Sequence, residues 1–268
     1  DAILHVLRCF DDGNVVHVDG SVDPIRDKEV IDMELQLKDL ETVQARATKI
    51  KKAAQTGDKD AAKSYGFYEK VLAALESGQS ARSVELDDSE VVMMKELQLL
   101  TSKPVLYVCN VDEGSVVSGN AYVEQVRQAA EAEGASIMVI GAAIEADIAE
   151  LETHEERAMF LEDLGLEEAG VAKLIRQAYA LLNLQTYFTA GDKEVRAWTF
   201  RRGYTAPQAA GVIHTDFQKG FIRAEVMKYD DFVALGSESA VKDAGKLSVE
   251  GKEYPVQDGD IMHFRFNV

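Results

Sequence analysis

The residues of this 268-residue chain that are best suited to chemistry follow a short apolar strand. The run 104–109 ends directly in Asn110-Val111-Asp112-Glu113-Gly114. An amide and carboxylates that follow a buried strand are held at one edge of a sheet, where they can form paired hydrogen bonds with a planar ligand such as a nucleobase. The same polar run is also typical of an ordinary turn. The sequence therefore offers a candidate base-recognition loop, with a simple turn as the alternative.

The chemistry of this loop becomes clearer beside the guanine-reading loop of P-loop GTPases, Asn-Lys-x-Asp. There the Asp accepts hydrogen bonds from the N1–H and the exocyclic amine of guanine, and the Asn braces the loop. Here Asn110 is kept, whereas Val111 replaces the Lys and Glu113 replaces the Asp. The additional methylene of Glu113 shifts the carboxylate by about one bond length, which spoils a paired contact that needs heavy atoms near ~2.9 Å. Adenine has an acceptor at N1 where guanine has a donor, and a donor at N6 where guanine has an acceptor, so the altered loop favours adenine.

A second candidate loop, Gly141-Ala142-Ala143-Ile144, follows the next apolar strand. Its small residues let backbone N–H groups approach a base, as in the last recognition loop of GTPases. A tight strand-to-helix turn is the alternative. The loop is therefore a candidate second contact for the same ligand.

Residue patterns that hold phosphates or metals are missing from the sequence. The two Gly-Lys pairs, at 245–246 and 251–252, lack the spacing and the following Ser/Thr of GxxxxGK[ST]. The five histidines show neither HExxH nor paired ligand spacing, which disfavours a metal enzyme. We therefore expect no phosphate-binding and no metal-binding residues within this chain.

An alternation of strands and helices positions the two candidate loops. A first strand over 2–10 is followed by a short apolar piece at 15–18. Later come the strand 104–109, a helix over 121–133, the strand 136–140 and acidic helices to about Leu182. This order is typical of a doubly wound parallel α/β sheet. Ligands bind such sheets outside the carboxyl ends of the strands, so loops 110–114 and 141–145 are expected to lie together.

Residues 27–100 predict a helical domain inserted between the first two strands. Gly57-Asp58 separates two runs of heptad-like apolar spacing, and Gly78 ends the second. Two long helices joined by a short turn predict an antiparallel hairpin, and a third helix over 88–100 returns the chain to the sheet. Three helices of an ordinary bundle are the alternative. The predicted contact positions are Val30, Met33, Leu37, Leu40, Ala47 and Ala54 in the first helix, and Tyr65, Tyr68, Leu72 and Leu75 in the second.

From about Leu184 the pattern changes to that of a small mixed α+β domain. Strands over 186–189 and 195–200 flank a Gly191-Asp192 turn, which is a hairpin signature. Later strands, over 220–226, 246–249 and 261–266, surround a helical stretch near 207–216.

The charge of the chain divides unevenly along the sequence. Residues 184–268 carry a net charge of −1, whereas the first 183 residues carry the other −17 of the total of −18. Because RNA and DNA attract basic surfaces, general DNA binding is disfavoured. Any RNA contact is expected on the C-terminal domain.

Several segments together resemble the YchF-type Obg-like ATPases of the P-loop GTPase superfamily. They follow the family order over nearly the whole chain, and the C-terminal ones are highly specific. The most similar run reads YALLNLQTYFTAG over 179–191. The segments are Ala2–Phe10, Asn14–Val18, Val22–Ile25, Phe160–Gly165, Tyr179–Gly191, Lys193–Trp198, His214–Phe217, Lys219–Glu225 and Gln257–Phe264.

The resemblance implies an architecture in four pieces. Residues 1–26 and 101–183 are expected to form part of a P-loop GTPase-like domain, with the inserted helical, coiled-coil domain at 27–100. Residues 184–268 are expected to form a TGS domain of β-grasp type. The family's N-terminal part, with its phosphate loop, Mg²⁺-binding residues and DxxG switch, has no counterpart among these residues.

The resemblance also implies a function. It implies binding and hydrolysis of ATP in preference to GTP, with Mg²⁺ bound through the N-terminal segment, and association with ribosomes in the cytoplasm. Asn110, Val111 and Glu113 match the family's altered base loop, and Ala142 and Ala143 match its last loop. A non-enzymatic ribosome- or RNA-binding adaptor that uses the hairpin and the TGS domain is the alternative.

Two expectations concern the chain as it stands. It begins at Asp1 directly in a strand pattern and without Met, which predicts a fragment of a longer protein. The chain alone is expected to be inactive and to bind ATP weakly. A few base contacts of about 0.5–1.5 kcal/mol each cannot offset the ~4 kcal/mol or more of lost translational and rotational freedom.

The remaining expectations concern partners and compartment. Cys9 and Cys109 lie in apolar runs, which predicts reduced core thiols. No apolar stretch approaches the ~20 residues that span a bilayer, so a membrane partner is not expected, and the chain is predicted to be cytoplasmic. Six residues of the C-terminal domain are expected to contact ribosomal RNA, with an ordinary solvated surface as the alternative. Those residues are Arg201, Arg202, Tyr204, Lys219, Arg223 and Lys228.

Overall fold

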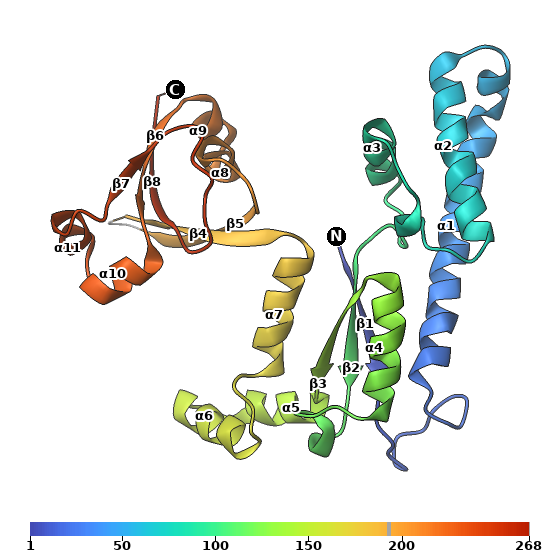
Figure 1. Cartoon of the computed structure of the whole chain (residues 1–268), viewed down its shortest axis with the longest axis horizontal. Helices are drawn as coiled ribbons and strands as arrows, with labels where there is room; N and C mark the ends of the chain where they lie inside the picture. Colours follow the sequence, from blue (N-terminus) through green and yellow to red (C-terminus); the bar gives the residue numbers. More distant parts are fainter. Residues whose placement is uncertain (192–193, 268) are drawn as a thin grey trace. The chain divides into compact units, whose positions relative to one another are not determined.

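The computed structural model describes residues 1–191 and 194–267. They form two compact units, Asp1–Ile175 and Arg176–Val268, and each is described by itself (Figure 1). Asp192 of the expected hairpin turn and Lys193 of the family segment lie outside the described residues. Within those described ranges, no helix is both long enough and apolar enough to cross a membrane.

A three-stranded parallel sheet lies at the centre of the first unit, as the sequence predicts. Its strands β1 (Ile3–Arg8), β2 (Val105–Asn110) and β3 (Ser136–Ile140) lie side by side in that order. The pairing of Arg8 with Asn110, and of Asn110 with Ile140, aligns the three carboxyl ends. Both loops that follow β2 and β3 therefore begin at the same edge of the sheet.

Helices complete this α/β layer. Helix α4 (Ala121–Glu133) packs Val123 and Val126 against Leu7 and Tyr107 of the sheet. Cys9 and Cys109 are free thiols in the same core. A hydrogen bond with Cys109 and burial together raise the pKa of Cys9. Three further helices follow β3, namely α5 (Ala142–Glu150), α6 (His154–Asp163) and α7 (Gly170–Leu181).

The inserted helices form the predicted hairpin (Figure 1). Helices α1 (Pro24–Gln55) and α2 (Lys59–Glu76) lie side by side, followed by the short η1 (Ala81–Ser83) and by α3 (Asp88–Leu97). An aspartate side chain caps the N-terminus of each of the three α-helices by accepting two backbone N–H bonds. These caps are Asp23, Asp58 and Asp87.

The contact face of the hairpin differs from the predicted heptad positions. Met33 is 61% exposed, and Val30 and Leu37 are exposed as well. The fully buried positions of the hairpin core are Val43, Ala47, Phe67, Val71 and Leu75. The physical reason is length: α2 has 18 residues and α1 has 32, so α2 can cover only part of α1.

Helix α3 ends three residues earlier than predicted. Gln98 adopts a left-handed conformation with φ of 54°, which ends the helix at Leu97. The side chain of Asp39, which is buried, then accepts hydrogen bonds from the backbone N–H groups of Leu100 (2.8 Å) and Thr101 (2.6 Å). It also accepts one from the Thr101 hydroxyl, so this carboxylate fixes the return of the chain to β2.

The apolar piece predicted after the first strand lies in an exposed loop. Residues 11–22 form turns, and Val18 is 99% exposed. Arg8 holds the start of this loop by donating to the carbonyl oxygens of Phe10, Asp12 and Val15. The loop is thus fixed by polar contacts rather than by burial of its valines.

The second unit is a five-stranded mixed sheet of the predicted β-grasp type. Strands β4 (Leu184–Ala190) and β8 (Ile261–Phe266) are parallel and lie beside each other. Antiparallel neighbours flank them in the order β5-β4-β8-β6-β7, with β5 at Val195–Arg201, β6 at Phe221–Met227 and β7 at Ser248–Glu250. The helices are α8 (Ala206–Ile213), α9 (Thr215–Lys219), α10 (Tyr229–Leu235) and α11 (Glu238–Asp243).

A buried core joins α8 to the sheet of the second unit. Tyr187 is fully buried, and its hydroxyl donates to the carbonyl oxygen of Ala209 (2.9 Å). Asp260, which is also fully buried, accepts hydrogen bonds from Lys228, Tyr254 and the backbone of Gln257. These contacts close the unit around its own residues.

Candidate functional site

The two candidate base loops meet at the carboxyl edge of the parallel sheet. The Asn110 side-chain oxygen accepts a hydrogen bond from the backbone N–H of Ala142 (2.9 Å). One residue further, the N–H of Val111 donates to the carbonyl oxygen of Ile140 (2.9 Å). Loops that lie 30 residues apart in the sequence are therefore joined by two direct bonds.

This geometry leaves hydrogen-bond donors available where the two loops meet. With its oxygen occupied by Ala142, the Asn110 amide presents its NH₂ group as a donor. Ala143 is the second residue of α5, and the first N–H groups of a helix have no partner within the helix. Two donors on rigid elements can recognise acceptor atoms of a planar ring.

Glu113 and Val111 occupy different environments. Glu113 is exposed and begins a 3₁₀ turn, η2 (Glu113–Ser115), which the Asp112 carboxylate supports by accepting from the Ser115 hydroxyl (3.0 Å). Val111 is only 4% exposed, and its side chain packs in the core with Val123 and Val126. A contact of Val111 with a base would therefore involve its backbone, whose N–H already donates to Ile140, and the assignment of Val111 to the base loop stays a prediction.

Asn120 is a positioning residue that the sequence interpretation missed. Its amide donates to the carbonyl oxygen of Cys9 (2.7 Å), and its oxygen accepts from the N–H of Val123 (3.1 Å). It thereby links the end of β1 to the start of α4. An Asn at the N-cap position before an apolar helix was the available signal.

A small cavity of about 360 Å³ lies next to these loops. Glu145 spans its side: its carboxylate accepts from the N–H groups of Gly170 (2.7 Å) and Val171 (3.1 Å) and so caps α7. A side chain at position 170 would meet this carboxylate at 2.8 Å, so only glycine permits the contact. The main residues that line the cavity are Val116, Val117, Ile140, Gly141, Leu166 and Lys173.

A cluster of possible metal ligands, His17, Asp19 and Asp27, lies at the start of α1. His17 Nδ1 accepts from the N–H of Asp19 (3.2 Å), so Nε2 carries the proton and donates to Asp27 (2.8 Å). Arg26 pairs with both carboxylates, at 2.9 Å and 3.5 Å. Burial would raise the pKa of Asp27, but the bonds from Arg26 and His17 outweigh it and lower that pKa. These contacts tie residues 17–19 of the loop to the start of α1.

The structure separates the expected RNA contacts into different places. In the strand register, Arg201 lies opposite Leu184 at one end of the second sheet, and Arg223 lies opposite Arg265 toward the other end. The register places them eight residues apart along the strands, about 26 Å at ~3.3 Å per residue. Arg201 and the adjacent Arg202 are exposed, so they remain together as one basic pair.

Three other expected RNA contacts have their own positions. Lys228 donates to Asp260 (2.7 Å) and to the Tyr254 hydroxyl (2.9 Å), so its ammonium group is used inside the unit. Tyr204 is half-buried and packs against the core. Lys219 is exposed at the end of α9.

Comparison with known proteins places these features in a family. Residues 184–267 match the family model described as "YchF-GTPase_C: Protein of unknown function (DUF933)". The chain is 53% identical to the "Ribosome-binding ATPase YchF" of Bacillus subtilis, over 100% of this chain and 74% of that protein. It is 43% identical to the "Obg-like ATPase 1" of Rattus norvegicus, over 100% of this chain and 68% of that protein.

A solved structure shows the same arrangement of elements. The structure of the Schizosaccharomyces pombe YchF GTPase superposes with a TM-score of 0.84 at 38% sequence identity. The match covers 99% of this chain and 72% of that one. Sequence and structure therefore agree on one family.

Proposed function

The chain belongs to the YchF family, and from that premise we propose that it supplies the base-recognising and ribosome-contacting parts of an ATP-preferring hydrolase. Relatives in this family are named ribosome-binding ATPases. The observation that carries the base-recognition part is the bond from Ala142 N–H to Asn110. It joins the two loops into one rigid surface with free donors.

Adenine fits the donors and acceptors of this surface. The Asn110 NH₂ group suits N7, an acceptor in both purines, and the Ala143 N–H suits N1, an acceptor in adenine alone. The Glu113 carboxylate accepts from the N6 amine of adenine. It lies one methylene farther from the loop than the Asp that pairs with guanine. Selection of ATP over GTP then follows from the missing guanine contact rather than from a new steric barrier.

Phosphate chemistry is outside the reach of these residues. No stretch of the 268 residues forms GxxxxGK[ST], and in the cluster of His17, Asp19 and Asp27 the His17 Nδ1, the Asp27 carboxylate and one oxygen of Asp19 already contact protein groups. Phosphate loop and Mg²⁺ provide most of the affinity and the charge stabilisation in this superfamily. In the proposal, ATP phosphates and Mg²⁺ are bound by a phosphate-loop segment, and no catalytic step is assigned to this chain.

The test of the base assignment is nucleotide competition in a protein in which this chain follows a phosphate-loop segment. ATP is expected to bind at least about tenfold more tightly than GTP, and Glu113→Asp to narrow that ratio. Asn110→Ala should weaken both nucleotides because N7 is common to both, whereas Ser118→Ala, on the exposed part of the same loop, should change neither. Tenfold tighter binding of GTP by the unaltered protein would contradict the assignment.

The same account predicts weak binding by the 268-residue chain alone. Calorimetry with MgATP should show no affinity in the micromolar range, and the chain should show no ATP turnover, because the base contacts cannot offset the lost freedom of motion. Micromolar affinity or measurable turnover would show that groups within this chain bind the phosphates.

The ribosome contact is assigned to the second unit. Its near-neutral charge and the exposed Arg201–Arg202 pair suit an approach to RNA, which the first unit would repel. An adaptor function without hydrolysis would use the same contact. The two proposals differ in nucleotide turnover. A protein in which this chain follows a phosphate-loop segment hydrolyses ATP if the first proposal holds and does not if the chain serves as an adaptor.

A further inference from the structure

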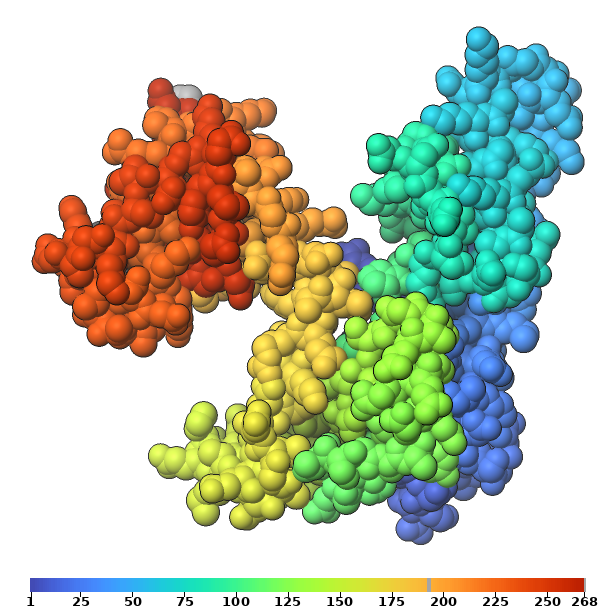
Figure 2. Space-filling view, in the orientation of Figure 1, coloured from blue at the N-terminus to red at the C-terminus, as the bar shows by residue number. Residues whose placement is uncertain are grey.

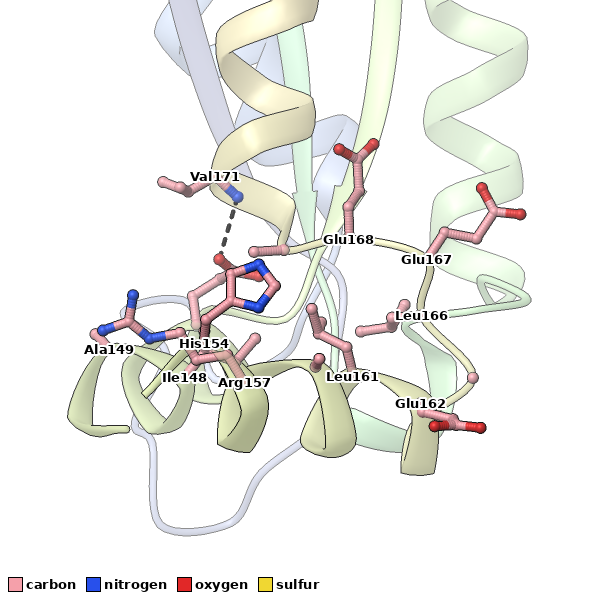
Figure 3. A pocket seen from close by; sticks show the side chains of 14 residues that line it. Ile148, Ala149, His154, Arg157, Leu161, Glu162, Leu166, Glu167, Glu168 and Val171 are labelled. Atoms are coloured by element: carbon pink, nitrogen blue, oxygen red, sulfur yellow. Dashed lines mark hydrogen bonds between the residues drawn. The ribbon is translucent and has the colours of Figure 1, made fainter. Parts of the chain in front are cut away.

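A large cavity in the first unit lies away from the base loops, between α5, α6 and the loop that leads into α7 (Figure 3). Its volume is about 980 Å³, at the upper end of the ~300–1,000 Å³ of ligand pockets. Its floor is apolar, with Ile148, Leu161, Leu166 and Val171 among its residues. Figure 3 shows Leu161 and Leu166 in the space between α6 and this loop.

Two of the three helices around this groove, α6 and α7, leave apolar side chains exposed. Within the described residues, α6 has no fully buried residue, although it carries Met159, Phe160 and Leu161. Met159 is 67% exposed, and Ile175 on α7 is exposed as well. In the space-filling view, α6 lies at the surface of its unit (Figure 2). An apolar surface of this kind, rimmed by polar groups, marks an interaction site.

The groove is a built feature rather than a gap between mobile helices. Glu145 ties α5 to the first two N–H groups of α7, and Gly170 permits their close approach. A capping box fixes the start of α6: Thr153 accepts from the N–H of Glu156, and Glu156 accepts from the N–H of Thr153. The walls are therefore held before any partner arrives.

The charge around the groove is strongly negative. Residues 142–170 contain ten acidic residues and one basic residue, a net charge of −9, which is half of the −18 of the whole chain. Glu162 and Glu167 line the groove and are exposed, and Figure 3 shows both carboxylates pointing away from its apolar floor. The single base, Arg157, donates to the carbonyl oxygen of Leu151 (2.7 Å).

We propose that this groove binds a basic amphipathic helix of a protein partner. The apolar floor fits the leucine-like side chains along one face of such a helix, in the helix-in-groove mode. The acidic rim fits the lysine or arginine residues that flank that face. Nucleic acid and anionic lipid surfaces are excluded as occupants by the same charge. The site is thus distinct from the ribosomal RNA contact assigned to the second unit.

The direct test uses a fluorescein-labelled model peptide of about 18 residues, with leucines at i, i+3, i+4 and i+7 and lysines elsewhere. Fluorescence anisotropy with the 268-residue chain should show saturable binding that weakens at least about tenfold between ~0.05 M and ~0.5 M salt. A peptide with the leucines replaced by serine tests the apolar floor. A peptide with the lysines replaced by glutamate tests the acidic rim. Both are expected to bind at least about tenfold more weakly.

Variants locate the binding on the molecule. Glu162→Lys with Glu167→Lys should weaken binding at least about tenfold, whereas Glu150→Lys with Glu152→Lys changes the net charge equally outside the groove lining and should have a far smaller effect. Ala158→Trp fills the groove from an exposed helix position without changing charge and should also abolish tight binding. The matched control is Ala146→Trp, which is exposed and not part of the lining.

Several results would overturn the proposal. Equal affinity for the leucine and serine peptides would reduce it to non-specific charge attraction, and equal loss in both charge variants would do the same. Tight binding of the glutamate peptide would contradict the acidic rim. A dimer in light scattering that Ala158→Trp dissociates would show that a second copy of this chain occupies the groove. Circular dichroism of every variant distinguishes lost binding from lost folding.

Discussion

The two units of this chain differ in how completely they bury their apolar side chains. In the second unit, the central strands place Tyr187 and Met262 in a fully buried core that its own helices close. In the first unit, the edge strand β1 leaves Val6 63% exposed, and α6 has no fully buried residue. The core of the second unit is closed by its own helices, whereas the first unit leaves apolar side chains of β1 and α6 exposed. The site proposals for nucleotide and peptide both lie on the first.

Each unit nevertheless depends on a buried carboxylate that gathers several donors. Asp39 binds two backbone N–H groups and a hydroxyl, and Asp260 binds an ammonium, a hydroxyl and a backbone N–H. Buried carboxylates are stabilising only when fully hydrogen-bonded. We therefore predict that removal of Asp39 or of Asp260 destabilises only the unit that contains it.

The largest effect is expected from Asp260→Ala. Removal of the carboxylate leaves Lys228, Tyr254 and the N–H of Gln257 without their acceptor, which should destabilise the second unit by about 3 kcal/mol. Trp198 is the one tryptophan of the chain and lies in this unit, so its fluorescence during urea unfolding reports the second unit alone. Far-UV circular dichroism is dominated by the long helices of the first.

In that experiment the tryptophan transition should move to lower urea while the main helical transition stays. Glu253→Ala, at an exposed position of the same loop, is the control and should change neither. An equal shift of both transitions would show that the two units unfold together.

A smaller effect, with a defined pH dependence, is expected from Lys28→Met in the first unit. Lys28 is buried and pairs with Asp32 (2.7 Å) and with Glu133, which also accepts from the Tyr107 hydroxyl (2.9 Å). Loss of the ammonium leaves Asp32 without its ion-pair partner and Glu133 with only Tyr107 and the more distant Arg82 (3.5 Å), and should cost about 2 kcal/mol near neutral pH. The control is Lys38→Met, which removes an exposed ion pair with Glu41 and should change the free energy of unfolding little.

The sign of the pH dependence follows from the shifted pKa values. Burial would raise the pKa of Glu133, but the hydrogen bonds from Lys28 and Tyr107 outweigh it and lower that pKa below 4.5. Stabilisation by Glu133 is therefore complete above pH ~4.5 and is lost as pH falls through the folded pKa. Burial would lower the pKa of Lys28, but Asp32 and Glu133 raise it, so its contribution persists up to about pH 10.5. The difference in the free energy of unfolding between the unaltered chain and Lys28→Met should therefore shrink in acid. A difference that grows below pH ~4 would contradict the ion pair of Lys28 with Glu133.

The smallest effect is expected at the proposed ribosome contact. Reversal of Arg201 and Arg202 to Glu should weaken ribosome co-sedimentation about tenfold and flatten its salt dependence, because two phosphate contacts are lost. Lys219→Glu with Arg223→Glu is the matched reversal elsewhere on the same unit and should have less effect. Unchanged pelleting of the Arg201/Arg202 variant at every salt concentration would remove the assignment.

The sequence predicted the main elements well because their signals are local. Apolar runs located β1, β2 and β3, and the Gly57-Asp58 break located the hairpin turn. The proximity of Asn110 to Ala142 followed from the geometry of parallel strands. The burial of Val111 could also have been predicted, since Tyr107, Cys109 and Val111 alternate on one face of the strand.

Other features depend on partners that no local pattern contains. The exposure of Met33 follows from the shorter length of α2, and the role of Asp39 depends on amides about 60 residues away. The Glu145 cap of α7 and the groove beside it depend on how three helices meet. Such contacts are products of tertiary packing, which a heptad or strand pattern does not encode.

The central claim, that Asn110 and the start of α5 read adenine, has a direct measurement in this chain. Titration of ¹⁵N-labelled protein with adenosine monophosphate at millimolar concentrations, in the range expected for a ligand held by a few hydrogen bonds, should shift the Asn110 side-chain NH₂ signals and the backbone signals of Ala142 and Ala143. Guanosine monophosphate should shift them much less at the same concentration. Equal or larger shifts with guanosine monophosphate, or shifts confined to residues away from these loops, would contradict the account.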